Sequence, residues 1–167
     1  MIDGASGFGN GRVIPAGPLR EPVAAAAARC GAAVLIGADA LAAAAALPAG
    51  LPVLRARLVA TETEGLAGRR VLAFAGIGRP DKFFETLAAA GADIVEKLGF
   101  ADHHPYGLAE MRKIIERAAG QAAVAVTTPK DAVRLPPGLR GQVRVVGVRL
   151  AWEDAAALDR LLAGVTG

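Results

Sequence analysis

The sequence predicts an α/β fold with a largely parallel sheet. Short apolar segments, partly β-branched and bounded by glycine, proline or charge, have the pattern of strands. Alanine- or leucine-rich segments of helical length lie between several of them, and this alternation is typical of a parallel sheet. With 167 residues, 53% of them apolar and 4% aromatic, the chain can build one domain, or one domain and part of another, without an aromatic-rich core.

The individual elements follow from the same pattern. In the helix expected over Leu108–Ala119, the residues Leu108, Met111, Ile115 and Ala118 recur at three- and four-residue spacing, so we expect them to form one buried stripe. The expected strands are Ala33–Ile36, Val53–Val59, Val71–Phe74, Asp93–Val95, Val124–Thr127 and Val143–Leu150, and the other expected helices are Pro22–Arg29, Asp39–Leu47, Asp81–Ala90 and Glu153–Leu162.

Composition argues against nucleic-acid binding and against a membrane-spanning helix. The net charge is only +3, and no segment is strongly basic. The longest uncharged run, Ala40–Leu54, contains Pro48 and Pro52 and is shorter than the roughly 20 apolar residues that a span needs, so we expect any membrane contact to be peripheral. The single cysteine, Cys30, fits a reducing cytoplasm, and we expect it to be a small buried side chain.

A change of pattern near residues 51–70 indicates a boundary between two lobes. Apolar residues there alternate loosely with Arg55 and Arg57, and the polar segment Thr61–Gly65 follows, so we expect an exposed strand or ribbon that joins the lobes. Only two residues precede Asp3 and its glycine-rich loop, where a complete strand is normal. A shortened first strand would leave backbone groups and apolar surface uncovered, so we expect the chain to be a fragment of a longer protein.

The first candidate site is Asp3 with the glycine-rich loop that follows it as far as Arg12. A carboxylate at the end of a strand is where nucleotide enzymes hold magnesium or its water. Asp3 is therefore a candidate metal ligand, and Gly9 and Asn10 are candidate nucleotide contacts. The alternative is a tight turn with glycines in left-handed conformations. The glycine spacing does not match the dinucleotide-binding fingerprint.

Three cations next to expected turns are candidate phosphate ligands. Arg20 precedes an expected helix and can bind a phosphate oxygen, or it can pair with Glu21 on the surface. Arg79 lies in a glycine turn between an expected strand and an expected helix. Backbone amides of that turn, together with Arg79, can bind an anion, or the turn can be a purely structural connection. Lys130 follows an expected strand, at the edge where α/β proteins bind ligands, although Asp131 beside it can simply cap a helical turn.

Both histidines of the chain lie together in the segment Asp102-His103-His104. Adjacent side chains of an extended segment point to opposite sides, so we expect Asp102 and His104 to share one face and His103 to take the other. Histidine can act as a base or a metal ligand near neutral pH. The alternative is a helix cap by Asp102 with surface histidines, but the clustering favours a site.

Taken in order, five motifs cover essentially the whole chain: the loop after Asp3, the turn 15–22, and the segments 74–84, 100–106 and 127–133. Their combination closely resembles the C-terminal half of the tetraacyldisaccharide 4′-kinase family, the lipid A kinases of Gram-negative bacteria. The resemblance implies a P-loop-kinase-like, two-lobed architecture. Residues 1–52 would be a remnant of the nucleotide lobe, 53–70 a ribbon linker, and 71–167 a complete C-terminal α/β lobe whose last helix can pack back on the first lobe.

The resemblance also implies a reaction and its participants. The family transfers the γ-phosphoryl group of ATP, with magnesium, to the 4′-hydroxyl of tetraacyldisaccharide 1-phosphate, at the inner face of the cytoplasmic membrane. His103 would pair with an aspartate of the first lobe to activate that hydroxyl, while Asp102 and His104 would orient neighbouring groups. Asp3, Gly9 and Asn10 would then lie on the ATP and Mg²⁺ side, and Arg20, Arg79 and Lys130 would bind substrate.

One departure from the family is large. The P-loop pattern G-x-x-x-x-G-K-[S/T] is absent, because none of the lysines follows a glycine. Phosphoryl transfer depends almost wholly on positioning and charge stabilisation, so we expect these 167 residues to be inactive alone. Two other functions stay open: a non-catalytic module that binds lipid or sugar phosphate, and a metal-dependent phosphoesterase that uses Asp102, His103 and His104.

Overall fold

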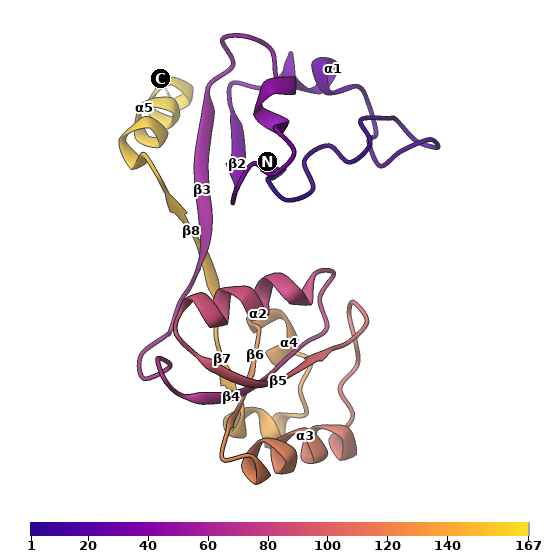
Figure 1. The fold of residues 1–167 in the computed structure, drawn as a ribbon, viewed down its shortest axis with the longest axis vertical. Coiled ribbons are helices and arrows are strands. Elements are labelled where there is room, and N and C mark those ends of the chain that lie inside the picture. Colours follow the sequence, from indigo (N-terminus) through magenta and orange to yellow (C-terminus); the bar gives the residue numbers. More distant parts are fainter. Residues whose placement is uncertain (167) are drawn as a thin grey trace. The chain divides into compact units, whose positions relative to one another are not determined.

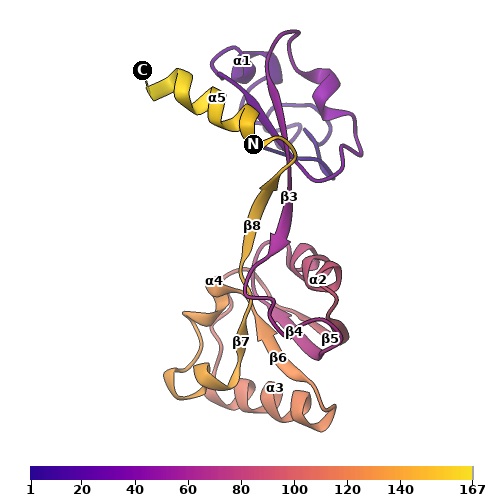
Figure 2. The same ribbon diagram turned by 90° about the vertical axis from the view of Figure 1, so that its left-hand side faces the viewer.

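The computed structural model describes residues 1–166, and the chain divides into two compact units (Figures 1 and 2). The first contains Met1–Leu58 and the chain from Leu150 onward, and the second contains Val59–Arg149. Each unit contains both helices and strands. The expected linker at 53–70 and the assignment of the two parts to a nucleotide lobe and an acceptor lobe remain predictions.

The second unit has a four-stranded parallel sheet in the order β5-β4-β6-β7. Its central strand β4 lies between β5 and β6, so the loops that follow these three strands leave the same edge of the sheet. The elements of this unit are β4 (Arg70–Ala75), α2 (Pro80–Ala89), β5 (Asp93–Gly99), α3 (Leu108–Gly120), β6 (Val124–Thr127), α4 (Pro129–Ala132), η2 (Pro137–Gln142) and β7 (Arg144–Val145).

Strand β4 is buried on both faces. Leu72 and Phe74 pack in one cluster with Met111 of α3, whereas Ala73 packs in a second cluster with Phe83 of α2. Because side chains alternate along a strand, the sheet is covered by α2 on one face and α3 on the other, which Figure 1 shows. Burial on both faces explains why the sequence of this strand is a continuous apolar run.

The buried stripe of α3 differs from the expected one. Met111, Ile114 and Ala118 are buried, and Ile115 is only partly buried. The expectation for Leu108 was wrong: it is the first residue of the helix and its exposure is 50%.

The first unit contains a sheet in the order β1-β2-β3-β8, in which β1, β2 and β3 are parallel. Its core is small: Ile2, Ala33, Leu35 and Ala43 are buried, with Phe8 among the partly buried side chains packed against them. The elements are β1 (Ile2–Asp3), α1 (Val23–Ala27), β2 (Ala33–Ile36), η1 (Ala43–Ala46), β3 (Val53–Ala60), β8 (Val148–Trp152) and α5 (Ala155–Thr166).

Two expected features of the first unit were wrong. The helix expected over Asp39–Leu47 is only the 3₁₀ helix η1, because the Asp39 carboxylate accepts the amide hydrogens of Ala43 and Ala44 at 2.6 and 3.1 Å, and Ala42 before them is left-handed. Cys30, which we expected to be buried, is exposed.

The strand expected over Val143–Leu150 was also wrong, because the chain forms the two separate strands β7 and β8. The interruption falls at Gly147, whose N–H donates to the Glu62 carboxylate at 3.0 Å and whose carbonyl accepts from the Thr61 amide at 2.9 Å. Within residues 1–166, every helix is too short or too polar to cross a bilayer.

Candidate functional site

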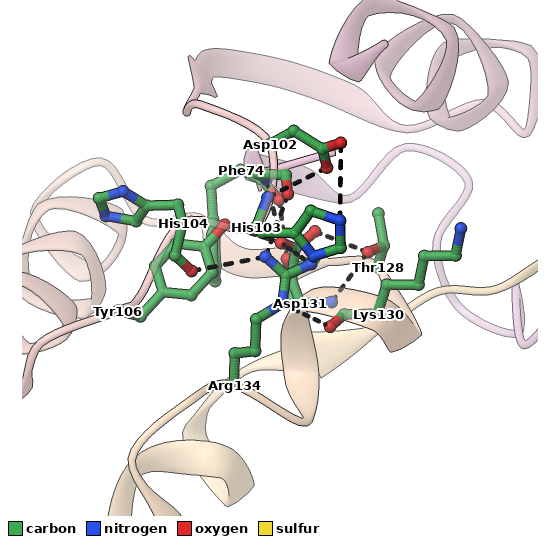
Figure 3. A network of polar contacts seen from close by, with 11 residues as sticks. Phe74, Asp102, His103, His104, Tyr106, Thr128, Lys130, Asp131 and Arg134 are labelled. Atoms are coloured by element: carbon green, nitrogen blue, oxygen red, sulfur yellow. Dashed lines mark hydrogen bonds and ion pairs between the residues drawn. The ribbon is translucent and has the colours of Figure 1, made fainter. Parts of the chain in front are cut away.

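The candidate site lies at the carboxyl edge of the second unit's sheet. Residues 76–79 follow β4, residues 100–107 follow β5, and Thr128 follows β6 and begins α4. Since these three strands are adjacent and parallel, their following loops meet, as Figure 3 shows. This is the edge at which open α/β sheets bind ligands.

Asp131 connects the three loops. Its side chain is fully buried, and its Oδ1 atom accepts the Gly76 amide hydrogen at 3.0 Å and the Tyr106 hydroxyl hydrogen at 3.0 Å. Its Oδ2 atom accepts the Thr128 hydroxyl hydrogen at 2.6 Å. Thr128 in turn is the N-cap of α4, since its Oγ1 accepts the Asp131 amide hydrogen at 3.1 Å. One carboxylate thus binds groups that follow each of the strands β4, β5 and β6.

Arg134 supplies the opposite charge. Its Nη2 lies 3.5 Å from the Asp131 carboxylate, and its Nη1 donates to the carbonyls of Gly76 at 3.2 Å and His104 at 3.5 Å. The guanidinium therefore binds the Asp131 carboxylate and the backbone of two loops (Figure 3). A buried carboxylate is tolerated when it is paired and fully hydrogen-bonded, which is the case here.

Tyr106 is buried beneath the histidine segment. Its ring makes edge contacts with Phe74, Phe100 and His104, with centroids 5.5, 5.4 and 4.9 Å away. Burial, and then the charge of Asp131 and the hydrogen bond to it, raise the pKa of the Tyr106 phenol far above its ordinary value. The phenol therefore stays protonated and donates its hydrogen to Asp131.

His103 presents its imidazole to solvent. Its side chain is 85% exposed, and its Nε2 lies 3.7 Å from Oδ2 of Asp102. Its amide hydrogen is shared between the Gly76 carbonyl and Oδ1 of Asp102, both at 3.0 Å. The backbone of His103 is left-handed, with φ of 61°.

His104 lies in a different environment. Its side chain is 25% exposed, its Nε2 is 2.9 Å from a carboxylate oxygen of Glu110, and its ring stacks on Phe100 at 4.6 Å. The expectation that Asp102 and His104 share a face was wrong, because the left-handed residue His103 interrupts the extended alternation. In Figure 3 the His104 ring points away from Asp102 and His103, so these three side chains do not converge on one point.

The candidate cations of this unit lie at the same edge of the sheet as the histidine segment. Arg79 is exposed in the loop after β4, and it is the N-cap residue of α2. Lys130 is exposed in α4, and its ammonium points away from Asp131 in Figure 3. Both residues thus follow the carboxyl ends of strands, as the sequence predicted.

The candidate nucleotide-side residues belong to the first unit. Asp3 ends β1, and its Oδ1 accepts the amide hydrogen two residues further on at 3.0 Å. Gly9 is left-handed, and a Cβ there would lie 2.7 Å from Pro18. Asn10 closes the loop by donating to the Ala16 carbonyl at 2.9 Å. The loop is thus a turn held by its own hydrogen bonds, and its shape depends on glycine.

Arg20 is exposed, and the alternative that it pairs with Glu21 was wrong, because Glu21 instead binds Arg29 at 2.6 Å. Among residues 1–166, no group of three or more His, Cys, Asp or Glu side chains is placed to hold a metal ion. Magnesium takes few protein ligands and keeps water and phosphate ligands, so the Asp3 carboxylate is a donor of the kind that it accepts, and its role as a metal ligand stays a prediction.

Comparison with known proteins places this chain among relatives. The family model described as tetraacyldisaccharide-1-P 4′-kinase matches residues 1–166. The chain belongs to the tetraacyldisaccharide 4′-kinase family. It is 58% identical to the tetraacyldisaccharide 4′-kinase of Rhodospirillum centenum, over 98% of this chain and 49% of the relative, and 58% identical to that of Gluconacetobacter diazotrophicus, over 97% and 50%. The chain thus spans about half the length of these family members.

A solved structure shows the same fold. The crystal structure of the "apo" form of LpxK from Aquifex aeolicus in complex with ATP superposes with a TM-score of 0.58 at 22% identity, over 93% of this chain and 49% of that one. The expected family, its kinase class and the α/β fold are confirmed. Sequence reasoning missed Arg134. It also missed the buried role of Asp131, for which a lone tyrosine beside two histidines and a Thr-x-x-Asp pattern after a strand were signals.

Proposed function

We propose that this chain is the acceptor-side part of a kinase that phosphorylates the 4′-hydroxyl of tetraacyldisaccharide 1-phosphate in lipid A biosynthesis. The observation that carries this proposal is the exposed His103 imidazole beside Asp102, at the carboxyl edge of a parallel sheet in a member of this family. Residues 1–52 then belong to the nucleotide lobe, 53–70 form the linker, and 71–167 form the acceptor lobe.

The chemistry assigned to this chain is proton handling and charge neutralisation. His103 pairs with a carboxylate of the nucleotide-binding half of the enzyme and so helps that group take the proton of the acceptor hydroxyl. Asp102 orients the imidazole across the 3.7 Å between Oδ2 and Nε2. His104 supports the loop through Phe100, and Arg79 and Lys130 neutralise phosphate charge, with Arg20 as a further phosphate ligand.

ATP and Mg²⁺ are the cofactors of the proposed reaction, and Asp3, Gly9 and Asn10 are their proposed contacts in this chain. When bound, magnesium neutralises charge that develops on the transferred phosphoryl group. Asp3 would bind that ion or its water. The lipid acceptor places the enzyme peripherally on the inner face of the cytoplasmic membrane, and no nucleic-acid partner is proposed.

The first test uses the chain alone. Purified chain, ATP, magnesium and the tetraacyldisaccharide 1-phosphate in mixed micelles should give no phosphorylated lipid above background, because the chain contains no P-loop sequence. Turnover near that of a full-length family member would contradict the reasoning. Binding of the lipid by the chain without turnover would support the acceptor-side assignment, and the same binding assay tests the alternative of a non-catalytic module.

The second test restores the remaining half. A chimera joins this chain to the part of the Rhodospirillum centenum relative that it does not match. In an active chimera, His103→Ala should lower kcat by about 10²–10⁴-fold with little change in KM for the lipid, which is the range for a group that assists proton transfer. Arg117→Ala is the matched control, since it removes a cation of α3 that pairs with Glu96, away from the candidate site. An unchanged kcat in the His103 variant would remove the histidine from the mechanism.

A further inference from the structure

The backbone of His103 needs support from its surroundings. A residue with a side chain rarely adopts a φ of 61°, and such a conformation costs free energy that neighbouring contacts must offset. One such contact is the hydrogen bond from the His103 amide to the Gly76 carbonyl, at 3.0 Å, and the same amide also donates to Oδ1 of the neighbouring Asp102. The position of the exposed imidazole therefore depends on what holds Gly76.

Gly76 is held on both sides of its backbone. Its N–H donates to Oδ1 of Asp131 at 3.0 Å, and its carbonyl accepts from Nη1 of Arg134 at 3.2 Å as well as from His103. A Cβ at position 76 would lie 3.0 Å from the Cβ of His104. The absence of a side chain at Gly76 is what lets the two loops approach this closely.

Arg134 also reaches the histidine loop directly, through the carbonyl of His104 at 3.5 Å. It is kept in place by the buried Asp131 carboxylate. Its planar fork can bind a carboxylate and carbonyls of two loops at once, which a point charge does less well. Every link between Asp131 and the exposed imidazole is thus a hydrogen bond or an ion pair of this unit.

We propose that Asp131 and Arg134 are positioning residues, which act through Gly76 to fix the left-handed turn that presents His103 to the acceptor. Neither residue touches the reacting atoms in this arrangement. The catalytic consequence rests on the proposed function of His103, whereas the control of the loop is a property of this chain that can be measured without activity.

The test is amide hydrogen exchange by NMR on the isotopically labelled 167-residue chain. Arg134→Ala should speed exchange at the amide of His103 by about tenfold or more. Without Arg134, a local opening of this loop has fewer hydrogen bonds to break and therefore occurs more often. Amides of the central strand, such as Ala73, should change less than about twofold. The His103 ring signals should broaden or split, and Arg134→Lys should restore part of the protection, since it keeps the charge but loses the fork.

Two further variants serve as a second test and as a control. Asp131→Asn retains one acceptor oxygen and should also speed exchange selectively at the His103 amide. This variant is used for the test if Arg134→Ala does not fold. Arg117→Ala, which removes a cation of the same unit far along α3, should leave His103 exchange unchanged. Equal acceleration at His103 and Ala73 would show a merely structural role and overturn the proposal, as would unchanged His103 exchange in folded variants.

The failure of the proposal differs from a failure of the proposed function. If Arg134→Ala loosens His103 while the chimera turns over equally with and without His103, the positioning of the loop stands and the catalytic role of His103 falls. If the His103 variant is inactive but Arg134→Ala leaves both the exchange and kcat unchanged, the proposed function stands and the positioning role falls.

Discussion

Tyr106→Phe is the sharpest test of the network around Asp131. The substitution removes one hydroxyl and leaves the ring contacts with Phe74, Phe100 and His104 in place. The lost hydrogen bond is buried and ends on a charged acceptor, a class worth about 1.5–3 kcal/mol. Asp131 keeps its other partners, so we expect the free energy of unfolding to fall by about 2 kcal/mol at neutral pH.

The same substitution predicts a pH dependence with a definite sign. The pKa of Tyr106 in the folded chain lies above the ordinary value of about 10 that a tyrosine has when unfolded. Between these two pKa values the folded chain keeps a proton that the unfolded chain has lost, so stability falls as the pH rises. The stability that the raised pKa of Tyr106 provides is fully present below about pH 10. Above that pH it declines by up to about 1.4 kcal/mol per pH unit.

The assay exploits the fact that Tyr106 is the only tyrosine of the chain. Urea unfolding of the wild type and of Tyr106→Phe, at pH 7 and at steps above pH 10, should show the wild type losing its advantage as the pH rises. Phenolate absorbance in the near ultraviolet should appear only as the protein unfolds. A phenol that ionises reversibly near pH 10 while the circular dichroism stays native would refute the assigned environment.

Three further predictions concern single side chains of the second unit. Met111→Ala should lower the free energy of unfolding by about 3 kcal/mol in urea unfolding, whereas Leu108→Ala should change it by less than about 0.5 kcal/mol, because only Met111 is buried. His104→Ala should destabilise by about 1 kcal/mol through loss of its stacking and its Glu110 contact, while His103→Ala should be neutral within about 0.5 kcal/mol in the same assay. Gly76→Ala should destabilise the chain and should speed exchange at the neighbouring amides, because its Cβ would contact backbone and side chains at about 3 Å; an unchanged exchange pattern would contradict that crowding.

The regular part of the fold was predictable because burial controls its pattern. The strands β2 and β6 have the expected bounds. A short apolar run between glycine, proline or polar residues is too short for most helices and is therefore usually a buried strand. The failures come from individual hydrogen bonds, which the periodicity of the sequence does not reveal. Asp39 bonds the amides that a regular helix would have used, and Glu62 binds Gly147 from 85 residues away.

The candidate site was predictable in its position but not in its construction. Clustering of both histidines after an expected strand placed the exposed His103 just beyond the carboxyl end of a strand, where the structure has it. Their orientation was not predictable, because the left-handed backbone of His103 departs from strand alternation. Arg134 offered no signal at all, since its role depends on carbonyls of two loops that the sheet order brings together.

Asp131 illustrates why a local pattern can mislead. The alternative that Asp131 simply caps a helical turn was wrong, because Thr128 is the cap of α4 and Asp131 lies inside that helix. A cap contributes about 1 kcal/mol and works equally well at the surface, so capping gives no reason to bury a carboxylate completely. Burial becomes favourable only when the charge is paired and every oxygen is bonded, and here the partners come from three loops and Arg134. The buried charge therefore fixes the backbone while the exposed imidazole of His103 stays accessible, and a chain that needed only a stable helix start would require neither.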